Sequence, residues 1–171
     1  MRYEQIGDAI GGTPLVRVDA LLPAAARAKG IRLYAKVEML GPTGSIKDRT
    51  AKALIDDLHF RGLLAPGREL LEPTSGNTGA ALAVHAAARG IPLTLVMPAN
   101  VTEERRAFVR ALGATIVDSP ADEGSNGAVA LARAMAKADS KYVSPDQYSN
   151  QANPKVHEVT TAPEILADLP E

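Results

Sequence analysis

The 171-residue sequence contains no cysteine and no tryptophan, and aromatic residues make up only 4% of it. The absence of cysteine excludes a disulfide scaffold, a thiolate nucleophile and a zinc site with sulfur ligands. It also fits a reducing compartment, so we expect a cytoplasmic protein. The sequence has no excess of charge of one sign: it contains 19 Lys and Arg and 20 Asp and Glu, which gives a net charge of −1. We therefore expect no nucleic-acid partner and no membrane partner.

Long hydrophobic runs are also missing. The longest apolar stretch, residues 79–88, is interrupted by His85 and is shorter than the roughly 20 residues that a membrane-spanning helix needs. The first seven residues lack the basic start and apolar segment of a secretory signal, so we expect no export. With 46% hydrophobic and 23% charged residues, the composition indicates a soluble chain that forms one compact domain, or one domain plus pieces of another.

Short β-branched or aliphatic runs alternate with amphipathic helical patterns, which predicts an α/β fold with a parallel, helix-covered sheet. The expected strands are residues 32–38, 69–72, 93–97, 115–118 and 142–144. The expected helices are residues 46–64, 78–89, 103–112, 126–138 and 156–166. The stretch before residue 32 differs, with a possible strand at 15–18 and an Ala-rich helix at 23–29, and we expect it to belong to another layer or domain.

A Gly/Pro-rich loop at residues 41–45 leads into a helix, with Ser45 predicted as N-cap and Asp48 as its capping-box partner. Lys47 then lies in the first turn, on a stripe continued by four apolar residues, Ala51, Leu54, Ile55 and Leu58. Burial and the positive end of the helix dipole both favour its neutral amine, the form that attacks carbonyl groups. Lys47 is therefore a candidate Schiff-base residue. A lysine whose stem covers the core edge while its ammonium reaches solvent fits the same spacing. Asp48 and Lys52 have the spacing of a surface ion pair.

A second candidate site lies in residues 71–79, where a strand is followed by a loop of small hydrogen-bond donors and then by a helix. Such a loop presents N–H and hydroxyl groups at a helix N-terminus and at the carboxyl end of a strand, where open α/β sheets bind anionic ligands. A plain turn between strand and helix is the alternative. The polar loop 145–154 could orient a ligand through its amides. We expect His85 to be buried and hydrogen-bonded and His59 to be exposed, so we predict no metal site.

Together these stretches resemble the pyridoxal-phosphate enzymes of the cysteine synthase and cystathionine β-synthase family, which have the tryptophan-synthase-β type of fold. The resemblance runs the length of the chain and covers residues 11–16, 42–49, 72–79, 97–98, 104–106, 112–114, 147–153 and 160–165. It implies pyridoxal 5'-phosphate as cofactor, bound to Lys47 as a Schiff base, with Asn77 hydrogen-bonded to its ring oxygen. It also implies that the substrate carboxylate lies among six residues: Thr74, Ser75, Gly76, Asn77, Thr78 and Gln147.

The reaction that this resemblance implies is β-replacement on an O-activated L-serine, either O-acetylserine or O-phosphoserine. The amine of Lys47, once released from the cofactor, would remove the Cα proton, and a sulfur nucleophile would then add to give L-cysteine. The implied partners are a small amino-acid substrate and a sulfur donor, and the implied assembly is a homodimer.

The sequence also departs from the family pattern. Gly41 stands where the family usually has Asn, and Ala162 where it has Gly. The family continues beyond the position of Glu171 into a larger domain that holds the phosphate-binding loop and the residue facing the pyridine nitrogen. We therefore expect a truncated form of a fold-type II enzyme, with a small three-layer domain at residues 40–146. Residues 1–39 and 147–171 would be segments of an incomplete larger domain, with exposed apolar surface.

Two other interpretations remain open at the level of the sequence. The first is a non-catalytic binding module or one half of a split enzyme that a second chain completes. The second is a sister enzyme with the same cofactor, such as a dehydratase, a threonine synthase or a diaminopropionate synthase.

Overall fold

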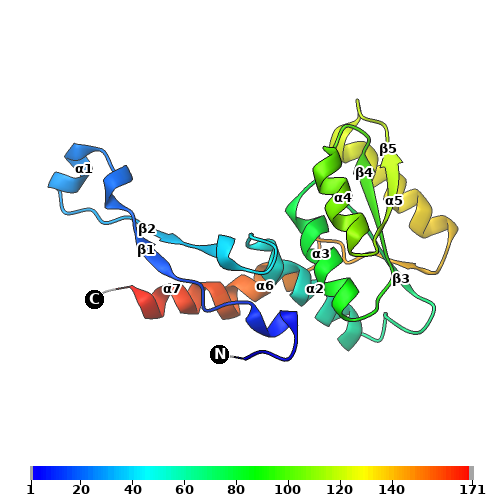
Figure 1. Cartoon of the computed structure of the whole chain (residues 1–171), viewed down its shortest axis with the longest axis horizontal. Helices are drawn as coiled ribbons and strands as arrows, with labels where there is room; N and C mark the ends of the chain where they lie inside the picture. The colour runs from blue at the N-terminus through cyan, green and yellow to red at the C-terminus, as the bar shows by residue number, and fades with distance from the viewer. Residues whose placement is uncertain (1, 170–171) are drawn as a thin grey trace.

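The computed structural model describes residues 2–169, which form a compact α/β body and an extended arm (Figure 1). The body contains a four-stranded parallel sheet in the order β5-β4-β3-β6. Its strands are β3 (Glu69–Pro73), β4 (Leu93–Pro98), β5 (Thr115–Ser119) and β6 (Tyr142–Val143). These strands confirm the predicted parallel sheet, with boundaries within one residue of those expected.

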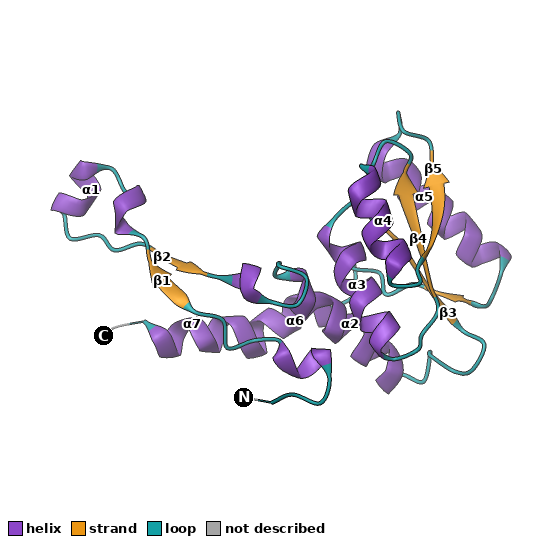
Figure 2. Ribbon diagram, viewed as in Figure 1, coloured by secondary structure: helices purple, strands orange, loops and turns teal. Residues whose placement is uncertain are grey.

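Helices cover both faces of this sheet (Figure 2), which makes the body a three-layer α/β domain. On one face lie α3 (Asn77–Ala88) and α4 (Glu103–Ala111), with α2 (Lys47–Phe60) packed beside α3. On the other face lies α5 (Gly124–Ala138). Every residue of β4 is buried, because side chains on both of its faces meet a helical layer. This architecture confirms the predicted α/β fold class, a parallel sheet covered by helices.

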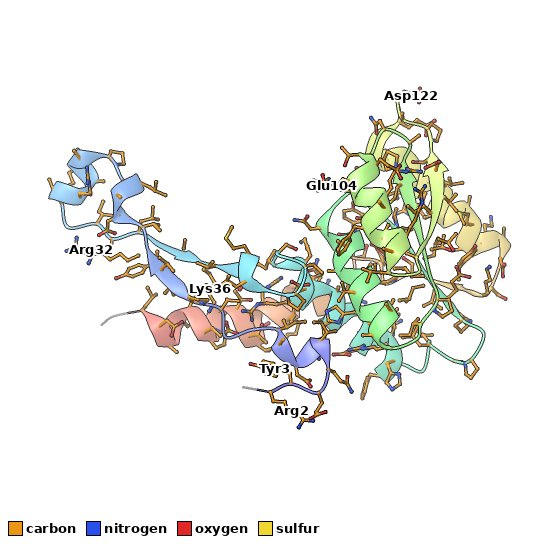
Figure 3. All side chains as sticks on the ribbon, viewed as in Figure 1. Arg2, Tyr3, Arg32, Lys36, Glu104 and Asp122 are labelled. Carbon is orange, nitrogen blue, oxygen red and sulfur yellow. The ribbon has the colours of Figure 1, made fainter. Side chains whose placement is uncertain are left out.

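The arm combines both ends of the chain (Figure 1). Its strands β1 (Leu15–Arg17) and β2 (Tyr34–Lys36) form an antiparallel pair, and a short helix α1 (Ala24–Ala28) lies between them in the chain. Three 3₁₀ turns, Ile6–Ala9, Asp19–Leu21 and Glu38–Leu40, complete the N-terminal part. The C-terminal part is α6 (Ala152–Val156), a π-helical turn (His157–Thr161) and α7 (Ala162–Asp168). Lys36 of β2, labelled in Figure 3, joins the two parts through an ion pair with Glu164 of α7, 2.8 Å.

Three predicted elements differ from the observed ones. The helix expected at residues 156–166 begins at Ala152 and contains a π-helical turn, His157–Thr161. The strand expected at residues 32–38 is only three residues long and pairs with β1 instead of joining the parallel sheet. Helix α2 ends at Phe60 and not at residue 64, because Gly62 adopts a φ of +68° and the N–H of Leu63 bonds back to the carbonyl of Leu58. Among the described residues, no helix is both long and apolar enough to span a bilayer.

Most of the exposed large apolar side chains lie in the arm. Leu21, Met39 and Leu166 are each more than 70% exposed, and no hydrophobic side chain in residues 2–46 is buried. In contrast, the body has apolar cores on both faces of its sheet. The expectation of exposed apolar surface near both ends of the chain is confirmed.

Candidate active site

Lys47 is the first residue of α2 and is half-buried. The four apolar residues that continue its stripe, Ala51, Leu54, Ile55 and Leu58, are all 0–1% exposed. Within residues 2–169, no hydrogen bond or ion pair engages the ammonium group of Lys47. In contrast, Lys36 and Lys52 are paired with carboxylates. The structure therefore places an uncommitted amine at the start of a core-packed helix.

The hydroxyl of Ser45 accepts a hydrogen bond from the N–H of Lys47, 3.3 Å, as expected of an N-cap residue, but the predicted capping box and ion pair of Asp48 are wrong. Asp48 is 1% exposed, and its carboxylate accepts hydrogen bonds from the backbone N–H of Thr43, 3.0 Å, and from the hydroxyl of Thr43, 2.7 Å. It therefore secures the preceding loop and forms no capping box with Ser45. Lys52 pairs instead with Asp56, 2.7 Å, one turn further along the helix. The i, i+4 spacing alone did not reveal that Asp48 points toward the buried loop.

Five of the predicted site residues, 74–78, lie in the loop between β3 and α3 and in the first two positions of α3. The hydroxyl of Thr74 accepts bonds from the N–H groups of Gly76 and Gly79, both 3.3 Å, which shapes the start of α3. Gly79 is required there, because an added Cβ would lie 2.6 Å from Cγ2 of Thr74. Asn77 is exposed and its amide has no partner within the described residues. The first N–H groups of α3 thus open at the carboxyl end of β3, a geometry suited to an anion.

Gln147 meets this loop from a distant part of the sequence. Its Oε1 accepts a hydrogen bond from the hydroxyl of Thr78, 2.7 Å, and its Nε2 donates to the carbonyl of Pro73, 3.4 Å. Asn153 donates to the carbonyl of Gln147, 2.9 Å, and accepts from the hydroxyl of Thr50, 3.1 Å. Since Thr50 lies one turn after Lys47, a continuous hydrogen-bonded path joins the lysine helix, Gln147 and the 74–78 loop.

His157 is a site neighbour that the sequence reasoning missed. Its Nε2 lies 3.4 Å from the hydroxyl of Thr50, and its Nδ1 lies 3.0 Å from the hydroxyl of Thr161. Burial lowers the pKa of His157, and the positive charge of Lys47 lowers it further. His157 begins a π-helical turn, His157–Thr161. The periodicity of the sequence does not reveal such a turn, so no sequence signal pointed to this residue.

The other two histidines are placed largely as predicted. His59 is exposed. His85 is 1% exposed, and burial lowers its pKa, but its Nε2 has no hydrogen-bond partner, so the expectation that it is fully hydrogen-bonded is wrong. The described residues contain no group of three or more His, Asp or Glu able to hold a metal ion.

Glu72 is a second residue that the sequence reasoning missed. It is 0% exposed near the end of β3, and its carboxylate accepts hydrogen bonds from the N–H groups of Asp146, 3.1 Å, and Gln147, 3.3 Å. Burial raises the pKa of Glu72 to about 7, although these N–H donors favour the charged form. The sequence did contain a signal for Glu72, because it is an acidic residue within a predicted apolar strand, where a charge is costly to bury.

The comparisons with known proteins agree with this geometry. Residues 6–171 match the family model described as pyridoxal-phosphate dependent enzyme. The chain is 47% identical over 167 residues to cysteine synthase A of Salmonella typhi, covering 97% of this chain and 50% of that protein. It is 44% identical over 164 residues to a probable cysteine synthase of Bacillus subtilis, covering 96% and 51%.

Solved structures give the same result. An O-acetylserine sulfhydrylase, isoform 3, from Entamoeba histolytica superimposes with a TM-score of 0.90 at 36% identity, covering 98% of this chain and 50% of that one. An O-ureido-L-serine synthase superimposes with a TM-score of 0.88 at 41% identity, covering 98% and 51%. The chain thus spans about half the length of the relatives it matches, and it corresponds to their N-terminal half.

Proposed function

The chain belongs to the pyridoxal-phosphate dependent enzyme family, and we propose that it forms the lysine-bearing half of a cysteine synthase. The reaction is β-replacement on an O-activated L-serine, O-acetylserine or O-phosphoserine, with a sulfur nucleophile, giving L-cysteine. The observation that supports this proposal is an uncommitted, half-buried Lys47 on a helix that hydrogen bonds connect to the 74–78 loop. The connection runs from Thr50 through Asn153 and Gln147. The similarity to cysteine synthases of several bacteria supports the same reaction.

The residues of the site fit the cofactor and the amino-acid substrate. Lys47 offers an unpaired amine for a Schiff base, and the exposed amide of Asn77 is free to bond a ring oxygen. When bound, the cofactor supplies an electron sink for the electron pair left at Cα. Lys47, once released, takes the Cα proton as general base. The substrate carboxylate is held by the N–H and hydroxyl groups of residues 74–78 together with Gln147.

We propose that the arm belongs to a second, larger domain. Residues 1–39 and 147–171 would pack on that domain, and residues 40–146 would form the small domain that carries Lys47. The exposed apolar side chains of the arm support this division. Packing on the larger domain would remove their apolar surface from water, which is favourable. A homodimer of the complete protein and a cytoplasmic location are further expectations of the same proposal.

One observation favours a second candidate, a sister reaction with the same cofactor. An O-ureido-L-serine synthase and an O-acetylserine dependent cystathionine β-synthase of Helicobacter pylori share the fold of this chain, each with a TM-score of 0.88. The choice of nucleophile is therefore a separate question from the role of Lys47.

The first test is direct labelling of the lysine. The purified chain is mixed with pyridoxal phosphate, its visible spectrum is recorded, and the adduct is reduced with borohydride and mapped by peptide mass spectrometry. We expect a visible band and a label on Lys47, both lost in Lys47→Ala. The control is Lys52→Ala, which removes an ion-paired lysine of the same helix and should keep the label.

The second test supplies a C-terminal half. The C-terminal half of a bacterial cysteine synthase is added to the unreduced chain with pyridoxal phosphate, and sulfide-dependent cysteine formation is measured with O-acetylserine and with O-phosphoserine. Activity that requires both halves and Lys47 supports the cysteine synthase proposal. Labelling without specificity for Lys47 contradicts it.

A further inference from the structure

Glu72 accepts several hydrogen bonds from the turn at residues 144–147. Besides the N–H groups of Asp146 and Gln147, the hydroxyl of Ser144 donates to its Oε2, 3.4 Å. That hydroxyl also accepts a bond from the N–H of Asp146, 3.1 Å. Both carboxylate oxygens of a fully buried glutamate are therefore directed at the turn formed by residues 144–147.

This turn contains a residue with an unfavourable backbone conformation. Asp146 has a φ of +50° and is the only non-glycine residue with positive φ in the described part of the chain. Such a conformation is disfavoured for residues with a Cβ and persists where surrounding contacts enforce it. The N–H bonds that Glu72 accepts come from Asp146 itself and from the residue that follows it.

The residue that follows is the one that reaches the anion-binding loop. Gln147 contacts Thr78 and Pro73 through its side chain, while its own backbone N–H is held by Glu72. The position of the Gln147 amide therefore depends on a carboxylate that does not line the loop itself. Glu72 lies in β3, two residues before the 74–78 loop begins, so the same strand positions both Glu72 and that loop.

We propose that Glu72 is a positioning residue that holds the 144–147 turn so that Gln147 is delivered to the substrate carboxylate. This inference rests on the proposed function, because it assumes that Gln147 binds that carboxylate. Glu72 itself touches neither cofactor nor substrate. Removing its carboxylate should free the turn, weaken binding of the amino acid and leave the proton transfer by Lys47 unchanged.

The test uses Glu72→Gln and Glu72→Asp, with Glu69→Gln as the matched control. Glu69 lies on the same strand, but its carboxylate pairs with Thr94 and Lys141. Amide hydrogen exchange is measured by NMR on the chain without cofactor. We expect exchange at Asp146 and Gln147 to be about tenfold faster in both Glu72 variants and unchanged in the control, since each hydrogen bond that the carboxyl group accepts is worth about that factor. If Glu72→Gln does not fold, Glu72→Asp decides the question.

Kinetics of the loaded two-half enzyme give the second readout. We expect the KM for O-acetylserine to rise about tenfold in the Glu72 variants while kcat changes less than twofold. Unchanged exchange at both amides would overturn the positioning role. A Gln147→Ala variant tests the premise that Gln147 binds the substrate carboxylate. If this variant leaves the KM unchanged, Gln147 does not bind the carboxylate, and both the site assignment and this inference fail. If Gln147→Ala raises KM and the Glu72 variants do not, the positioning role alone fails.

Discussion

At the scale of single residues, Glu72 is a carboxyl group whose pKa the fold raises instead of lowering. Burial is the main cause, and it raises the pKa from the usual 4.5 to about 7. The folded protein thus holds a proton that the unfolded chain releases between these two pH values. Because the folded state binds more protons in this window, Glu72 makes the protein less stable as pH rises from about 4.5 to about 7.

This linkage predicts a pH-dependent effect of Glu72→Gln. Urea unfolding of the wild-type chain and the variant should show that the wild type loses stability relative to the variant between pH 4.5 and pH 7. The relative loss should be about 3 kcal/mol, the equivalent of the raised pKa. Other titrating groups are common to both proteins and cancel in the difference. Parallel stability curves across this pH range would contradict the prediction.

At the scale of elements, the start of α2 depends on a contact between the helix and the loop before it. Thr43 donates to the carboxylate of Asp48 through both its N–H and its hydroxyl, whereas Lys52 pairs with Asp56 and not with Asp48. A pair of double-mutant cycles with Asp48→Asn should give a coupling energy of about 1–2 kcal/mol with Thr43→Val. The coupling with Lys52→Ala should be close to zero. Equal coupling in the two cycles, measured by urea unfolding, would restore the surface-pair interpretation.

The packing of α3 on the sheet makes a separate prediction at this scale. In Gly79→Ala the new Cβ would lie 2.6 Å from Cγ2 of Thr74 and 3.3 Å from Cδ1 of Leu95. Helix propensity alone would stabilise this change by about 1 kcal/mol, but overpacking should cost about 1–3 kcal/mol. We expect a lower unfolding midpoint. A stabilised variant would mean that α3 can move away from β4 without loss.

At the scale of the whole molecule, one buried arginine connects the arm to the body. Arg49 of α2 has a side chain only 1% exposed, and its guanidinium bonds to Glu38 and to Glu164, each through two nitrogen atoms. Thr13 contributes a further bond to Glu38, 2.6 Å. These partners come from the N-terminal segment and from α7. The same contacts hold the pKa of Glu164 at about 2, chiefly through its bonds to Arg49.

Removing this arginine should release the arm. Arg49→Met leaves two partly buried carboxylates without their main partner, a change that typically costs about 3–5 kcal/mol. Limited proteolysis should cut first within residues 2–46, and urea unfolding should show the loss of stability. The control is Arg61→Met, because Arg61 forms an exposed pair with Asp57 and should cost less than about 1 kcal/mol. Equal protease resistance of the two variants would mean that other contacts hold the arm.

The sequence by itself determined the parallel α/β body, the core-facing stripe that begins at Lys47 and the composition of the 74–78 loop. These features depend on periodicity, glycine positions and local spacing, which act within a few residues of one another. Only the tertiary structure decided the partners of Glu72 and Arg49, because their contacts join segments that are far apart in the sequence and that packing brings together. The pairing of β2 with β1 was also decided by the tertiary structure. A three-residue strand has too short a hydrophobic pattern to specify which sheet it joins.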